Sequence, residues 1–116
     1  MEFTMNQGHV NAGEVINLDT LKGDMDVDSS YALVKTDDME VIRMALPEGK
    51  EINEHSVEGE MSMLCLKGDI TFTIDGNERN LNEDDWLYLQ REELFSYRVN
   101  RPTLLLVTIL FVGKRD

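Results

Sequence analysis

The residues that could carry out chemistry gather in one stretch, PEGKEINEHSVEGEMSMLCLKG, from Pro47 to Gly68. It holds His55, one of two histidines in the chain, and an imidazole titrates close to neutral pH. Such a side chain can act as a general base or can anchor a ligand. A lone histidine is more often a structural group, however, and Glu60 would be its partner only if the strand slipped by one residue. No catalytic residue can be assigned from the sequence.

Three sulfur-bearing side chains follow at alternate positions: Met61, Met63 and Cys65. Thioethers and thiols bind Cu(I), but an alternating apolar stripe of this kind is far more often the filling of a core. Cys65 is the single cysteine, and no neighbour in sequence would lower the pKa of its thiol. We therefore expect core residues here, with an inert thiol.

Strand geometry decides which of these residues can meet, because successive side chains point to opposite faces. If His55 faces an interior, then Asn53 and Val57 face it too. Phe95 and Tyr97 form a second set of the same kind, further along the chain.

The elements that position these residues are strands. Alternation of apolar and polar residues, bounded by Gly, Asp and Asn, recurs at intervals of about ten residues, and helix signals are scarce. In DITFTIDGNERNL, Asp75-Gly76 supplies the positive-φ pair of a tight hairpin turn. Asp37-Asp38 predicts another turn, and Asn100-Arg101-Pro102 predicts a break, since proline cannot donate to a ladder. Strands are expected over residues 31–36, 39–46, 51–57, 61–67, 70–74, 78–81, 85–89, 94–99 and 104–112.

In order and spacing, residues 39–111 resemble the cupin family. The first cupin motif is a glycine, a spacer, His-x-His, a glutamate and a closing glycine. Here Gly49 opens it, His55 follows after five intervening residues, and Gly68 closes it. The second motif matches Asp84-Asp85 and the apolar strand that follows. The resemblance implies an all-β fold, the double-stranded β-helix or jelly-roll barrel.

We expect the barrel to span residues 31–116, preceded by an N-terminal segment over residues 1–30. In that segment, the apolar residues between 14 and 18 predict one strand, and residues 22–30 predict a loop. A barrel of two sheets leaves edge strands, which proteins tend to cover. We therefore predict a homodimer in which the N-terminal strand pairs across a two-fold axis.

The resemblance also implies four metal-ligand positions, of which three lack a suitable donor. A typical cupin binds a divalent ion through three histidines and one glutamate. This chain keeps His55 but has Val57, Met61 and Phe95 at the other three positions. Valine and phenylalanine offer no lone pair, and a thioether suits Cu(I) better than Fe(II), Mn(II) or Zn(II). We predict a cupin frame that has lost its metal site, with no metal and no cofactor.

Without a metal, the interior implied by the resemblance is apolar, soft and aromatic, which is typical of small-molecule sites. We predict that it binds or senses a small organic ligand oriented by His55 and Tyr97. Two alternatives stay open: a small cupin enzyme of isomerase, epimerase or dioxygenase type, and a structural module with a filled barrel. The predicted lining is His55, Val57, Met61, Met63, Cys65, Phe95 and Tyr97.

Composition narrows the range of partners. The 116 residues fit a single domain, and 11 basic against 23 acidic residues give a net charge of −12. This charge disfavours phosphate backbones and anionic lipids, so we expect no nucleic-acid or membrane partner. The first residues lack the basic start and apolar core of a signal peptide, and no apolar run is long enough for a membrane helix. We expect a cytoplasmic protein.

Overall fold

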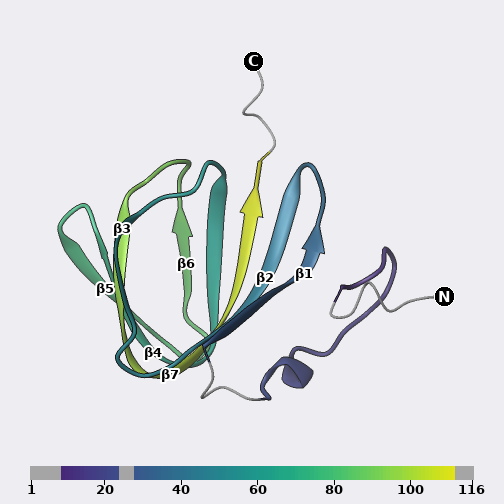
Figure 1. The fold of residues 1–116 in the computed structure, drawn as a ribbon, viewed down its shortest axis with the longest axis horizontal. Coiled ribbons are helices and arrows are strands. Elements are labelled where there is room, and N and C mark those ends of the chain that lie inside the picture. The colour runs from purple at the N-terminus through teal and green to yellow at the C-terminus, as the bar shows by residue number, and fades with distance from the viewer. Residues whose placement is uncertain (1–8, 24–27, 112–116) are drawn as a thin grey trace.

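The computed structural model describes residues 9–23 and 28–111 of the chain. Regular structure in these ranges is β-sheet apart from one short 3-10 helix, η2 (Leu18–Leu21), so the predicted all-β fold is confirmed. No helix in the same ranges is long and apolar enough to cross a membrane. Figure 1 shows the strands curving around a common centre; they are β1 (Ser29–Lys35), β2 (Met39–Leu46), β3 (Glu51–His55), β4 (Glu60–Ile74), β5 (Asn77–Asn82), β6 (Trp86–Leu89) and β7 (Phe95–Leu110).

Two long strands, β4 and β7, connect everything else. They pair antiparallel from end to end, and each contributes its two halves to different layers. The first layer has the order β1-β2-β7-β4-β6 and uses the C-terminal half of β7 with the N-terminal half of β4. The second layer has the order β3-β7-β4-β5 and uses the other two halves. The two layers are therefore parts of one continuous sheet that bends along β4 and β7.

The corner between the layers lies at Gly68. The register shifts there, so that Pro102 and Thr103 of β7 stand opposite this one residue of β4. Gly68 has a φ of 114°, and a Cβ at this position would lie 2.4 Å from the Thr103 Oγ1. Thr103 is fully buried; its Oγ1 accepts a hydrogen bond from the Asp69 N–H (3.0 Å) and donates one to the Arg101 carbonyl (2.7 Å). The hydroxyl thus satisfies backbone groups that the bulge removes from the ladder.

This corner corrects two predicted strand breaks. The sequence separated residues 61–67 from 70–74 and residues 94–99 from 104–112, whereas β4 and β7 run through both positions. Pro102 is tolerated because it falls in the bulge, where its missing N–H interrupts no regular ladder pair. Gly68 and Pro102 bend the strands without ending them. Residue 112 lies outside the described residues.

Both predicted hairpin turns are present. Asp75 and Gly76 have φ values of 54° and 81° and join β4 to β5, as the Asp-Gly pair requires. Asp37-Asp38 joins β1 to β2, and the Thr36 N–H donates to the Met39 carbonyl at 2.8 Å across that turn.

The predicted N-terminal strand between residues 14 and 18 is wrong. Asn17 instead caps η2: its side-chain oxygen accepts from the Asp19 N–H at 2.8 Å, and its carbonyl accepts from the Thr20 hydroxyl at 2.7 Å. A residue that hydrogen-bonds the backbone locally in this way favours a cap over a strand. The rest of the predicted segment includes residues 1–8 and 24–27, which lie outside the described residues.

The described N-terminal residues cover the outer face of the first layer. Leu21 packs into a second apolar cluster, and the Val10 N–H donates to the Leu33 carbonyl at the edge of β1 (2.7 Å). Val15, by contrast, is 92% exposed. The segment therefore packs on its own barrel, and the homodimer stays a prediction. The buried members of this outer cluster are Leu21, Leu33, Ala45, Leu66 and Leu104.

The corner generates a stability prediction. Gly68→Ala places a methyl group against Thr103 in addition to straining the backbone, whereas Gly76→Ala has only the strain, because nothing lies within 4 Å of its Cβ. We expect Gly76→Ala to lower the free energy of unfolding by about 1–2 kcal/mol. Gly68→Ala should cost about 1–3 kcal/mol more, through overpacking. Chemical denaturation of both variants measures the difference, and equal losses would contradict the role assigned to the corner.

Candidate functional site

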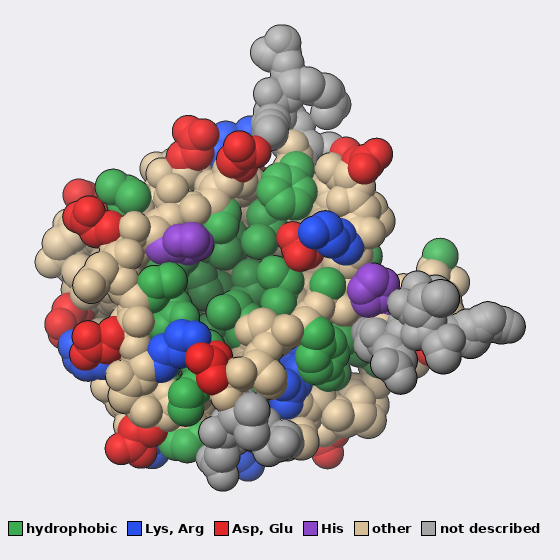
Figure 2. Space-filling view, viewed as in Figure 1, with side chains coloured by type: hydrophobic (Ala, Val, Ile, Leu, Met, Phe, Trp, Pro, Cys, Tyr) green, Lys and Arg blue, Asp and Glu red, His purple; other side chains and the backbone are tan. Residues whose placement is uncertain are grey.

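The inner faces of the two layers enclose an apolar bowl. Figure 2 shows a hollow on this face of the molecule with hydrophobic side chains at its floor and a histidine at its edge. The buried floor draws on both layers: Met61, Met63 and Cys65 come from the first, and Phe72 and Tyr97 from the second. Partly exposed apolar side chains pack against the floor, and we call them the mouth of the bowl; they are Ile42, Met44, Ile52, Val57, Ile74, Leu87 and Phe111.

The structure brings the apolar residues of the predicted lining into one cluster, and their role in ligand binding stays a prediction. Met61, Met63, Cys65, Phe95 and Tyr97 are each at most 8% exposed, and they belong to one cluster. Val57 packs against the same cluster at the mouth. The sequence analysis missed Ile42, Met44 and Leu87, although the alternation along β2 and β6 would have indicated them.

His55 lies at the rim, exposed to solvent, rather than inside the barrel. Its ring stands edge-on to Phe95, with the ring centroids 5.7 Å apart. The predicted alternation fails at this strand: the register shifts between Ile52 and His55, and Glu54 has a φ of 31°. Ile52, opposite Tyr97, therefore faces the bowl together with His55, whereas Asn53 is exposed. The bulge is the physical reason that Asn53 was misplaced.

Glu60 does not partner His55. Met61 is buried in the bowl, so the preceding residue faces outward, and the Glu60 carboxylate accepts a hydrogen bond from the Tyr88 hydroxyl at 3.1 Å. The strand has therefore not slipped by one residue, and the condition under which Glu60 would partner His55 is not met.

Cys65 has the environment of an inert thiol. It is fully buried at the floor of the bowl, and burial raises the pKa of its thiol to about 11. Its Sγ donates a weak hydrogen bond to the Lys67 carbonyl at 3.5 Å. Because the thiolate is the reactive species, this thiol is unsuited to nucleophilic chemistry at neutral pH.

A pair of charged side chains that the sequence did not indicate links the edge strands of the two layers beside the bowl. The Lys50 ammonium donates to the Asp28 carboxylate at 2.6 Å, which links the residue before β3 to the residue before β1. This hydrogen bond raises the pKa of Lys50. The link joins edge strands of the two layers, and its partners are 22 residues apart. No local pattern in the sequence could have predicted it.

Tyr97 lies beside this ion pair. Its ring packs edge-on against Phe72, with centroids 5.6 Å apart, and burial is the main cause that raises the pKa of its hydroxyl. The Lys50 charge lowers that pKa, and the Asp28 charge raises it. Within the described residues, the Tyr97 hydroxyl has no hydrogen-bond partner.

The residues present do not fit the metal of a typical cupin. At the four ligand positions, Val57 and Phe95 contribute hydrocarbon to the bowl, Met61 contributes a buried thioether, and only His55 offers an imidazole. Nor do residues 9–23 and 28–111 contain any group of three or more His, Cys, Asp or Glu side chains arranged to hold an ion.

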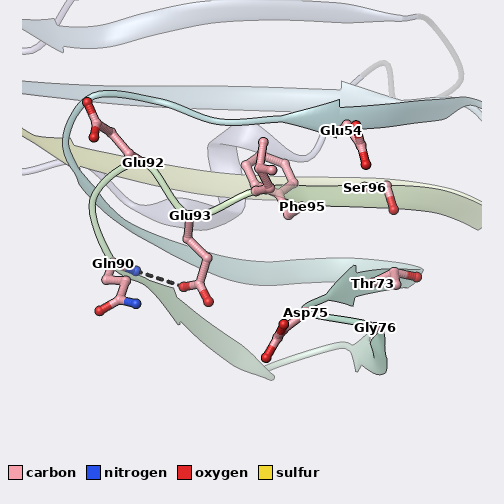
Figure 3. A pocket seen from close by; sticks show the side chains of 10 residues that line it. Glu54, Thr73, Asp75, Gly76, Gln90, Glu92, Glu93, Phe95 and Ser96 are labelled. Atoms are coloured by element: carbon pink, nitrogen blue, oxygen red, sulfur yellow. Dashed lines mark hydrogen bonds between the residues drawn. The ribbon is translucent and has the colours of Figure 1, made fainter.

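A second hollow, of about 600 Å³, lies beside the turn between β4 and β5. It shares Phe95 with the bowl but is lined mainly by polar side chains, and Figure 3 shows the Glu93 carboxylate bonded to the Gln90 backbone. Its carboxylates repel one another and any anion. Among the described residues, these carboxylates are not arranged to hold a metal ion either. The acidic residues of this groove are Glu54, Asp75, Glu92 and Glu93.

Comparison with known proteins rests on structure. No protein-family model and no curated protein matches the sequence. A cupin superfamily protein from Desulfitobacterium hafniense matches with a TM-score of 0.74 at 16% identity, over 89% of this chain and 94% of that one. A conserved protein of unknown function from Streptococcus pyogenes matches with a TM-score of 0.73 at 20% identity, over 88% and 90%.

Two further similar structures belong to named proteins. The DMSP lyase DddQ from Ruegeria pomeroyi has a TM-score of 0.67 at 20% identity, over 76% of this chain and 49% of that one. KdgF from a Halomonas species has a TM-score of 0.66 at 14% identity, over 73% and 81%. Identities this low define the fold alone. The chain has the double-stranded β-helix fold of the cupin superfamily, as the sequence predicted.

The donor set generates a prediction about metals. The protein should carry no stoichiometric transition metal after mild dialysis, as measured by elemental analysis. The triple variant Val57→His, Met61→Glu, Phe95→His should gain one, because it restores three nitrogens and one oxygen on the same frame. Apo stability should fall, since the new polar groups are buried.

The control replaces the new carboxylate by an amide: Val57→His, Met61→Gln, Phe95→His. It should bind Zn(II) more weakly than the triple variant, since a neutral amide is a poorer ligand for this ion. Near one equivalent of metal in the natural protein would overturn the interpretation. A folded triple variant that never binds metal would contradict the alignment of the four positions.

Proposed function

We propose that the protein binds a small organic ligand in the apolar bowl, without a metal ion. The observation that carries the proposal is the contrast between a fully packed floor and a mouth of apolar side chains that remain partly exposed. Contact between these apolar side chains and water is unfavourable, so a ligand that covers them gains free energy of binding. Concave, mostly apolar sites with a few polar groups are the usual form of small-molecule sites.

The magnitude of the apolar contribution shows why polar groups matter as well. A ligand that covers about 200 Å² of the mouth would gain about 5 kcal/mol, at about 25 cal/mol per Å². That corresponds to a dissociation constant of about 0.2 mM, before the costs of ordering the ligand. Tighter and selective binding therefore needs hydrogen bonds from the polar groups of the bowl, His55 at its rim and Tyr97 in its floor.

The enzymatic alternative has weaker support. Similar folds include a DMSP lyase, but that activity belongs to that protein. Among the described residues, no hydrogen bond or ion pair joins His55 to a carboxylate that would orient it as a base, and the Cys65 thiol is protonated at neutral pH. The filled-barrel alternative is disfavoured by the mouth, where Ile42, Met44 and Leu87 keep part of their surface exposed.

A dye-binding experiment tests the proposal. The fluorescence of Nile red, an uncharged dye, should rise on titration with the folded protein, since the dye binds exposed apolar hollows. Leu87→Gln, at the mouth, should weaken binding about tenfold, the equivalent of about 1.4 kcal/mol of lost apolar contact.

Leu110→Gln is the matched control, because Leu110 is 38% exposed on the outer face of β7, opposite Glu60. It should change the affinity less than about twofold if the dye occupies the bowl. Equal effects of the two substitutions would place the dye elsewhere and would count against the proposed function. Thermal unfolding of both variants shows that each remains folded.

A further inference from the structure

Tyr97 is the feature of the bowl that carries information about the ligand. Tyr97 is only 8% exposed as a residue, and within the described residues its hydroxyl makes no hydrogen bond. A hydroxyl that loses its water without gaining a partner costs free energy, and native proteins rarely leave one unpaired. Tyr97 stands opposite Ile52, which lines the mouth, and opposite Phe72 on the floor. The hydroxyl therefore lies where a bound molecule can supply the missing bond.

The neighbours of Tyr97 are richer in donors than in acceptors. An ammonium has three protons to donate, and Lys50 gives one of them to Asp28 at 2.6 Å. The Lys50 carbonyl accepts a hydrogen bond from the Val99 N–H at 2.9 Å, two residues along β7 from Tyr97, so the Lys50 and Tyr97 side chains leave the same face of the layer. A ligand oxygen beside these two side chains can accept from the phenol, from the ammonium or from both.

The local charge indicates that this oxygen is uncharged. Asp28 already compensates Lys50, so the pair has no net charge to offer an anion. The whole chain carries −12, which repels anions at longer range. A carboxylate entering the bowl would lose its hydration without a counter-charge, whereas a carbonyl loses much less.

We infer that the ligand is an apolar molecule with one uncharged hydrogen-bond acceptor, a ketone, ester or amide carbonyl, whose oxygen lies beside Tyr97 and Lys50. The inference rests on the proposed function, since it assigns the ligand class of the same bowl. The apolar body covers the mouth over Met44, Ile52 and Leu87, and the aromatic floor favours a flat, ring-bearing body.

Three matched probes test the inference: acetophenone, ethylbenzene and benzoate, which share a phenyl ring and differ in the polar end. Binding can be followed through the methyl signals of ¹³C-labelled methionine, because Met44, Met61 and Met63 all lie in the bowl. In the natural protein, acetophenone should bind about tenfold more tightly than ethylbenzene, and benzoate should bind most weakly.

Tyr97→Phe removes only the hydroxyl and keeps the ring. It should weaken acetophenone about tenfold and leave ethylbenzene unchanged, so that ethylbenzene also reports that the variant keeps an intact bowl. Tyr88→Phe is the control, because Tyr88 is exposed on the outer face and bonds Glu60. It should change neither affinity.

The outcomes separate the two claims. If ethylbenzene and acetophenone bind equally well and Tyr97→Phe affects neither, the bowl binds ligands but the carbonyl assignment is wrong. If benzoate binds most tightly, the uncharged acceptor is overturned in favour of an anion. If no probe shifts the three methionine signals at millimolar concentration, the proposed function fails together with the inference.

Discussion

The close approach of Gly68 to Thr103 is the constraint on which the rest of the structure depends. Both long strands pass through this point, so the angle between the two layers is set where a hydrogen atom, rather than a side chain, faces the Thr103 hydroxyl. Met61, Met63 and Cys65 lie before the bend of β4, and Phe72 lies after it. The bend at this glycine is what gives the bowl a floor drawn from both layers. The buried Thr103 hydroxyl pairs two backbone groups at the bend, the Asp69 N–H and the Arg101 carbonyl.

Val57, Met61 and Phe95 account both for part of the apolar lining and for its misfit to the metal of a typical cupin. Three inward histidines and a glutamate without an ion would leave polar groups unpaired in a desolvated interior. Val57, Met61 and Phe95 remove that cost and add packing, with about 1.5–3 kcal/mol available for each large apolar side chain that is fully buried. Among the described residues, polar groups accompany this apolar lining: His55 at the rim, Tyr97 in the floor, and the Lys50–Asp28 pair between the edge strands.

The parts of the fold that depend on local chemistry could be predicted from the sequence. Asp75-Gly76 specifies its own turn, and the alternation of Met61, Met63 and Cys65 placed them correctly on one buried face. Prediction failed where a distant strand overrides the local signal. The bulge at Glu54 reverses the face of Asn53, and Pro102 is accommodated by the partner strand instead of ending its own. The Lys50–Asp28 link exists only after both layers have closed, so no window of sequence contains it.

The position of β7 after the strands with which it pairs has a consequence for how the protein reaches this structure. Met39 pairs with Leu110, and Glu60 pairs with the same residue from the other side, so β2 and β4 both depend on β7. Contacts between residues so far apart in sequence slow folding, because loop closure comes before any compensating contact. During synthesis, neither layer can be completed until β7 has left the ribosome. Until then, the apolar strand faces stay open to the wrong partners, and the emergence of β7 becomes the moment at which folding competes with aggregation.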